Sequence, residues 1–295
     1  MKFYCAFLLA LITTFAEAQS FYAIRRERSL ILTAGTGTAS YFGELSNPGD
    51  YLKAKPNLNV GLQVFVTHRI AVRVEANWFM LSGSDQNADS EGRRLRNLSF
   101  RSSNFEISTV GQVDLFGNGN RYYRRPSFNL YGFAGVGILY FNPKAEYPYN
   151  SGNWISLEPL HTEGVSYSRI TPVIPFGLGA RIKATPNFNI VLEGGYRKTF
   201  TDYLDDVSTK YLDNNSFTDP VAKALADRRP ELTPALAPFA AGSIRGNPKT
   251  KDGYMLFSAK IEYYLPYDFR KSGKSRAYTK KRKATYRYIK KKRRK

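Results

Sequence analysis

Segments of ten or more residues with alternating apolar and polar side chains recur along the chain. In RIAVRVEANWF, Ile70, Val72 and Val74 share one face, while Arg73 and Glu75 share the other. The segments NFEISTVGQVDL, FNIVLEGGYRKTF and YMLFSAKIEYYL repeat this pattern. A period of two is typical of a β-strand that has one apolar and one polar face.

Four further runs bring the number of predicted strands to eight. They lie near Ser29 to Phe42, Asn57 to Val66, Phe128 to Phe141 and Pro172 to Lys183. Strands of this length can cross a bilayer when tilted, and an even number lets an antiparallel sheet close without an unpaired edge. The sequence therefore predicts an all-β fold, an eight-stranded antiparallel transmembrane β-barrel with long extracellular loops and a basic periplasmic tail.

The connections between these strands alternate in length. Those after strands two, four and six centre on Thr67-His68, on FGNGNRYYRR and on Thr185-Pro186-Asn187, whereas the others are longer. The last runs about fifty residues, from Thr201 to Asp252. Short periplasmic turns and long external loops are typical of outer-membrane barrels, so we expect both termini to lie in the periplasm.

A secreted β-sandwich or lipocalin-like barrel is the soluble alternative, since its strands also alternate. Such a fold would turn its apolar face inward. The uninterrupted aliphatic rows opposite Arg73, Glu75, Glu193 and Arg197 favour the membrane barrel. A mean hydropathy of −0.41 does not exclude a membrane, because barrel strands are polar on their lumen side.

The chain begins with MKFYCAFLLALITTFAEAQS, which has a basic residue, an apolar stretch and a small-residue site. This pattern indicates a secretory signal peptide. The predicted organisation is a signal peptide over residues 1–18, a periplasmic segment over 19–28, the barrel over 29–266 and a basic tail over 267–295. The only cysteine, Cys5, lies in the signal peptide, so no disulfide is expected after cleavage.

Basic charge is concentrated at the predicted periplasmic face. Fifteen Lys and Arg residues, and no acidic residue, lie between Arg270 and Lys295. A periplasmic tail does not meet nucleic acid, so its expected partners are outer-membrane lipid, peptidoglycan or an acidic protein face. The alternative is that the tail is a solvated, disordered extension without a partner. The predicted partner-binding residues are Arg25, Arg26, Arg28, Arg121, Arg124, Arg125, Arg276, Lys280, Lys281, Arg282, Tyr286, Arg287 and Tyr288.

Candidate chemistry is sparse. Asp202, Asp205 and Asp206 form the densest acidic cluster, but their spacing lacks the ligand pattern and glycine of a calcium loop. We expect them to bond loop backbone and Thr or Tyr hydroxyls. His161, with Ser156 and two glutamates nearby, is weak evidence for a catalytic triad. No catalytic residue, cofactor or metal site is predicted.

Asp219-Pro220 before VAKALADRR predicts the start of a short helix.

Several segments together resemble a known family. They are LRNLSFRSSNFEIS, YGFAGVGILYFNPKA, PLHTEG, IPFGLGARIK, LEGGYRKTFTDYLDDVSTKY and RGNPKTKDGY. They resemble the PorG-like outer-membrane β-barrels of the type IX secretion system of Bacteroidota-type bacteria, a domain-of-unknown-function family. The resemblance implies a non-enzymatic component of protein export, and in some members of gliding motility, that links a periplasmic ring of the lipoprotein PorK and its partner PorN to the outer membrane.

These patterns leave three hypotheses for the function. The first is a structural subunit of a secretion machine, because an eight-stranded barrel is too narrow to conduct proteins. The second is an envelope-anchoring barrel that binds peptidoglycan or lipid. The third is an outer-membrane lipid-modifying or proteolytic enzyme that uses the His161 region. Co-purification with a periplasmic ring, sedimentation with sacculi and loss of activity on His161→Ala distinguish them.

Overall fold

The computed structural model describes residues 28–47, 54–86, 88–119, 122–232 and 236–266. These residues make up the barrel and the loops attached to it. The predicted signal peptide, most of the segment over 19–28 and the whole tail over 267–295 lie outside the described residues.

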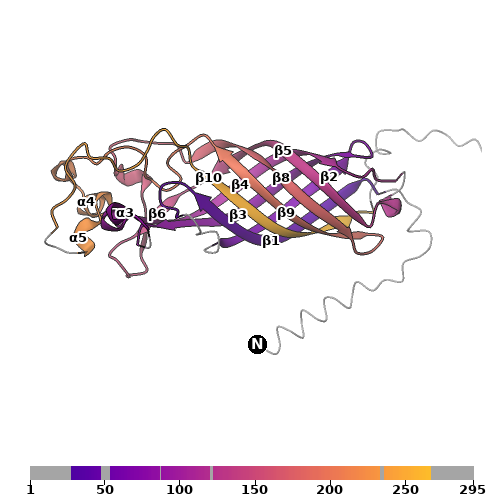
Figure 1. Cartoon of the computed structure of the whole chain (residues 1–295), viewed down its shortest axis with the longest axis horizontal. Coiled ribbons are helices and arrows are strands. Elements are labelled where there is room, and N and C mark those ends of the chain that lie inside the picture. Colours follow the sequence, from indigo (N-terminus) through magenta and orange to yellow (C-terminus); the bar gives the residue numbers. More distant parts are fainter. Residues whose placement is uncertain (1–27, 48–53, 87, 120–121, 233–235, 267–295) are drawn as a thin grey trace, which may run out of the picture.

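Eight long antiparallel strands form one closed sheet (Figure 1). Their order around the ring is β3-β2-β1-β10-β9-β8-β5-β4, and pairing of β3 with β4 closes it. The strands are β1 (Leu30–Phe42), β2 (Lys55–Phe65), β3 (Ile70–Ser84), β4 (Ser99–Asp114), β5 (Phe128–Tyr140), β8 (Ile170–Lys183), β9 (Phe188–Thr199) and β10 (Gly253–Tyr264). The prediction of an eight-stranded antiparallel barrel is confirmed.

The first and last strands are neighbours, with Ile31 opposite Tyr264, and Ile70 opposite Val113 marks the closing pair. Closure leaves no barrel strand with an unpaired edge, which is the condition for a sheet surrounded by lipid. The strand runs identified from alternation agree with the structure to within a few residues at each end.

The apolar face of each strand points outward. Leu178 is 73% exposed and Val136 is 67% exposed, whereas Arg73 and Glu75 on the other face are 2% and 3% exposed. This is the reverse of a soluble barrel, and an apolar exterior around a polar interior is the arrangement that outer-membrane barrels need. The soluble alternative is therefore wrong. No helix in the described part of the chain is long and apolar enough to span a membrane.

Three short connections meet at one end of the barrel, here called the turn end. They comprise residues 66–69, residues 115–127 and residues 184–187. The middle one carries the 3-10 turn η2 (Tyr122–Arg124). Both β1 and β10 have their free ends here, so the chain enters and leaves the barrel at the turn end.

The other four connections meet at the opposite end, here called the loop end, and fold into a cap beyond the strands (Figure 1). The predicted alternation in length is not strict, because the connection over 43–54 is no longer than that over 115–127. The cap contains the hairpin of β6 (Pro143–Glu146) and β7 (Trp154–Ser156), together with α3 (Glu91–Arg96), η3 (Glu158–Leu160), η4 (Asn214–Ser216), α4 (Pro220–Ala226) and α5 (Arg229–Leu232). Asp219 accepts a hydrogen bond from the Val221 amide at the start of α4, which confirms the predicted helix start.

Candidate functional sites inside the barrel and at its two ends

A network of opposite charges lies at the centre of the barrel interior. Arg73 forms ion pairs with Glu75 and Glu193 at 2.8 Å each, and Lys260 lies 2.8 Å from both carboxylates. The Tyr131 hydroxyl also donates to Glu193 at 2.7 Å. Two cations therefore balance two carboxylates, which a buried charge requires.

Similar pairs continue on either side of this network. Arg181 contacts Asp114 at 2.7 Å and Glu262 at 2.8 Å. Glu106 accepts a hydrogen bond from the Tyr254 hydroxyl at 2.6 Å and lies 3.7 Å from Arg197. These side chains are all buried. The interior is thus filled with paired side chains, as expected for a barrel of eight strands, and does not form a wide channel.

An apolar plug closes the barrel interior at the loop end. Leu204 and Val207, from the loop after β9, are each 1% exposed and belong to one hydrophobic cluster with strand residues such as Phe79, Leu139 and Leu256. The segment TFTDYLDDVST therefore folds inward and seals the mouth of the barrel.

The carboxylates of this segment bond the surrounding loops. Asp206 accepts hydrogen bonds from the hydroxyls of Thr162 and Tyr167, and it adopts a left-handed backbone conformation with φ of 67°. Burial raises the pKa of Asp206 to about 6, although the nearby Arg245 guanidinium lowers it.

The other two aspartates behave in the same way. Asp202 accepts from the Ser208 hydroxyl at 2.7 Å, and Asp205 accepts from the Val207 amide at 2.9 Å. The expectation that these residues bond loop backbone and hydroxyl groups is confirmed.

Arg245 and Glu163 form a further buried junction in the cap. The ion pair measures 2.8 Å, and Glu163 also accepts from the amides of Ser208 and Thr209. Sequence reasoning named Glu163 only as a glutamate near His161 and gave Arg245 no role, because the two residues come from loops far apart in the chain.

A second acidic group combines residues that no sequence pattern connects. Carboxylate oxygens of Glu44, Asp202 and Asp252 lie within 4.8 Å of one another. Burial raises the pKa of Asp202 to about 7 and that of Asp252 well above its usual value. Any side chain at Gly43 would collide with the Asp252 carboxylate, so this glycine allows the close approach.

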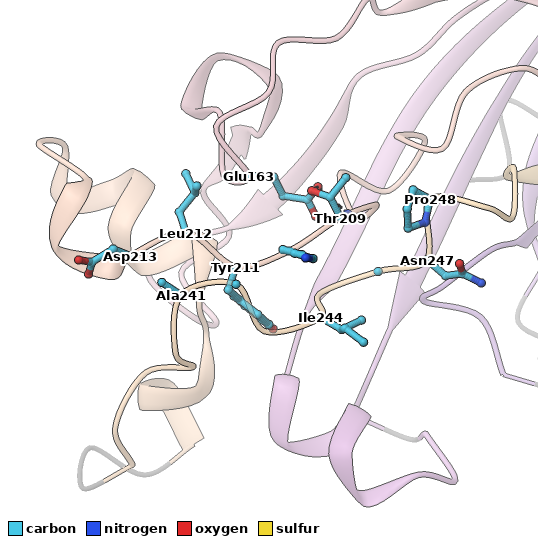
Figure 2. A pocket seen from close by; sticks show the side chains of 12 residues that line it. Glu163, Thr209, Tyr211, Leu212, Asp213, Ala241, Ile244, Asn247 and Pro248 are labelled. Carbon is cyan, nitrogen blue, oxygen red and sulfur yellow. Dashed lines mark hydrogen bonds between the residues drawn. The ribbon is translucent and has the colours of Figure 1, made fainter.

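A pocket of about 840 Å³ opens on the cap, between residues 209–213 and 241–248 (Figure 2). An isolated bridge between Lys210 and Ile244 joins these two segments, and Ile244 is 80% exposed. Both oxygens of Glu163, the acid at its edge, already accept hydrogen bonds or pair with Arg245. The pocket therefore has an apolar wall, and the second acid that lines it, the exposed Asp213, accepts a hydrogen bond from the Asn215 amide.

The His161 region does not assemble a catalytic triad in the described residues. His161 is exposed at the end of η3, and no hydrogen bond joins its imidazole to Ser156. Ser156 instead accepts from Asn142, and Glu158 pairs with Arg169 at 3.6 Å.

The turn end contains three of the predicted partner-binding arginines, and they differ in accessibility. Arg124 is exposed. Arg28 is partly buried and donates to the Tyr264 carbonyl at 2.7 Å. Arg125 is 4% exposed and lies over the ring of Tyr264, at 4.5 Å from its centre.

Arg125 is fully occupied within the protein. It donates to the Asn189 side chain and to the carbonyls of residues 122, 185, 186 and 188. Its assignment as a docking residue needs correction, because these contacts hold the turn between β8 and β9. The remaining predicted partner residues lie outside the described part of the chain: Arg25, Arg26, Arg121, Arg276, Lys280, Lys281, Arg282, Tyr286, Arg287 and Tyr288.

Comparison with known proteins places this barrel in a family. The family described as "Domain of unknown function (DUF6089)" matches residues 7–219. The chain belongs to this family. No curated protein matches the DUF6089 chain. Its closed ring of strands and apolar exterior make it an outer-membrane β-barrel.

Solved structures of similar fold include Neisserial surface protein A, with 8% identity, coverage of 80% of this chain and 97% of that one, and a TM-score of 0.41. A major outer membrane protein from Thermus thermophilus has 10% identity, coverage of 80% and 99%, and a TM-score of 0.41. The outer membrane enzyme PagL has 12% identity, coverage of 80% and 99%, and a TM-score of 0.32.

Proposed function

We propose that this outer-membrane barrel is a non-enzymatic component of a type IX protein secretion machine. In this role it anchors a periplasmic ring, of proteins resembling PorK and PorN, to the outer membrane. The turn end faces the periplasm, and both termini lie there. Docking uses the basic residues of the turn end together with the basic tail.

The observation that carries this proposal is the separation of charge along the molecule. Inside the barrel, basic and acidic side chains neutralise each other in pairs. At the turn end, Arg69 and Arg124 are exposed, and the chain continues from there into a segment with fifteen basic and no acidic residues from Arg270 onward. Such a surface suits a repeated acidic site, because several weak contacts to one ring add by avidity.

The filled interior supports an anchoring role over a conducting one. A protein-conducting barrel needs a wide lumen, whereas here Arg73, Lys260 and Arg181 occupy the interior and Leu204 closes its mouth. The function of this barrel then depends on its surfaces. The proposal names a type IX secretion machine because segments of this chain resemble PorG-like barrels.

Affinity purification from gently solubilised envelopes tests the proposal. Three proteins are compared with the intact chain: one stopped after Phe269, Arg124→Glu at the turn end, and the control Lys249→Glu, which changes an exposed lysine at the loop end. We expect the intact chain and Lys249→Glu to retain a stoichiometric periplasmic ring, and the truncated chain to lose it. Arg124→Glu should weaken retention and make it more sensitive to salt. If a normally inserted intact chain retains no ring protein, the secretion role is wrong.

A second candidate role is anchoring to the cell wall or to lipid headgroups, which the same basic charge favours. Sedimentation with purified sacculi and with anionic vesicles distinguishes this role. Binding to either that is lost after truncation at Phe269, in the absence of any ring protein, would make it the better account.

A further inference from the structure

The acidic group at the mouth of the barrel has the geometry of a cation site. Glu44 comes from the loop after β1, and Asp202 and Asp252 come from the two ends of the loop before β10. Two oxygens that each lie about 2.4 Å from one calcium ion are at most about 4.8 Å apart. The three carboxylate oxygens satisfy this limit, since all lie within 4.8 Å of one another.

Buried oxygen atoms without a partner give a second, independent indication of a ligand. Asp202 is 2% exposed, and its Oδ1 has no hydrogen-bond partner. Glu44 Oε2 is likewise buried and unpaired. The neighbouring Asp205, which is 1% exposed, also has an unpaired Oδ2. A buried carboxylate oxygen that accepts nothing is costly unless something binds it.

The nearby cations form their closest contacts with other groups. Arg96 is paired with Asp85 at 2.6 Å, and the exposed Lys251 donates to the Pro248 carbonyl at 3.4 Å. No described Lys or Arg forms an ion pair with Glu44, Asp202 or Asp252, in contrast to Glu163 with its Arg245. The group therefore lacks the paired cation that buried carboxylates such as Glu163 and Asp114 have.

We propose that Glu44, Asp202 and Asp252 bind one calcium ion at the loop end, with water completing the coordination. All the donors are carboxylate oxygens, which suit a hard cation, and no His or Cys takes part. Asp252 can serve although it accepts from the Tyr41 hydroxyl and the Leu204 amide, because each of its oxygens has two lone pairs. The bound ion would join both ends of the longest loop to the β1 rim and hold the plug residue Leu204 in place. This site is independent of the proposed docking at the turn end.

Calcium titration of the full chain, purified in detergent micelles and freed of metal with a chelator, tests the proposal. We expect saturable binding of one Ca²⁺ per chain with a Kd of about 0.1–1 mM, the range of extracellular calcium modules. Bound Tb³⁺ should show luminescence sensitised by the adjacent Tyr41, and Ca²⁺ should displace it. Calcium should also slow proteolysis of the cap.

Matched variants locate the ion. Asp202→Asn and Glu44→Gln keep side-chain size and should weaken Ca²⁺ binding at least tenfold. The control Asp89→Asn removes an exposed carboxylate elsewhere in the cap and should bind Ca²⁺ like the unmodified chain. The Ca²⁺ titration of the unmodified protein decides the outcome if a variant fails to fold. The proposal is wrong if the folded chain binds no Ca²⁺ saturably up to about 10 mM, or if Asp202→Asn and Glu44→Gln bind as well as Asp89→Asn.

Discussion

Arg245 and Glu163 form a buried ion pair, with Nη1 and Oε1 2.8 Å apart, that joins the two longest loops of the barrel. Both side chains are 2% exposed, and Glu163 also holds the amides of Ser208 and Thr209. This pair fastens the segment that plugs the barrel mouth to the loop after β5. The two longest loops are therefore joined through a buried contact.

Replacing Arg245 with alanine should open the cap. Glu163 would remain buried without a cation, and breaking such a pair costs about 3–5 kcal/mol. Hydrogen exchange of residues 201–209 should then accelerate by about two orders of magnitude or more. The control is Arg169→Ala, which removes a partly exposed pair with Glu158 at 3.6 Å and should cost about 0–1 kcal/mol. Equal exchange in the two variants would contradict this account.

The adjacent residues Arg124 and Arg125 should have separable effects. Arg125→Ala removes five hydrogen bonds, four of them to residues 185–189 at the turn between β8 and β9, so we expect a loss of about 2–4 kcal/mol in unfolding free energy. Arg124→Ala removes an exposed side chain and should change the unfolding free energy by less than about 0.5 kcal/mol. Urea unfolding of both variants in lipid vesicles, followed by tryptophan fluorescence, measures the difference. A smaller loss for Arg125→Ala than for Arg124→Ala would be inconsistent with the structure.

The barrel could be predicted from the sequence because alternation is a local signal. Within a single strand, the apolar Val72 indicates the lipid side and the charged Arg73 indicates the interior. This assignment needs no knowledge of which strands lie on either side. The distinction between Arg124 and Arg125 could not be predicted in this way. Two adjacent arginines look equivalent in a sequence, and only the path of the turn decides which one is buried.

The cap was beyond sequence reasoning for a different reason. Its contacts join residues that are far apart in the chain, such as Tyr41 and Asp252, which are separated by 211 positions. No periodicity links them. The local part of the cap was accessible, as the start of α4 at Asp219 and the hydroxyl partners of Asp206 show.

The central charge network predicts a non-additive mutant pair. Lys260→Met alone leaves Glu75 and Glu193 to share the single cation of Arg73, and should cost about 3–5 kcal/mol. The double variant Lys260→Met/Glu193→Gln restores balance between Arg73 and Glu75, so it should be more stable than Lys260→Met. Equilibrium unfolding in vesicles measures both. A double variant less stable than the single one would show that the charges are not balanced as described.

Protonation of Asp206 should stabilise the cap in mildly acidic solution. Its pKa is about 6 in the folded protein, against a usual value of 3.8, because burial disfavours the carboxylate more than Arg245 favours it. The folded state then holds a proton that the unfolded chain releases, so this contribution is lost as pH rises through about 6 and is fully present below about 4. It amounts to about 3 kcal/mol at most. Comparing proteolysis of the cap at about pH 7 and about pH 5, with a calcium chelator present, should show a smaller gain on acidification for Asp206→Asn than for the unmodified chain. Asp89→Asn, which changes an exposed acid, should keep the full gain, and an undiminished gain in Asp206→Asn would show that another group carries it.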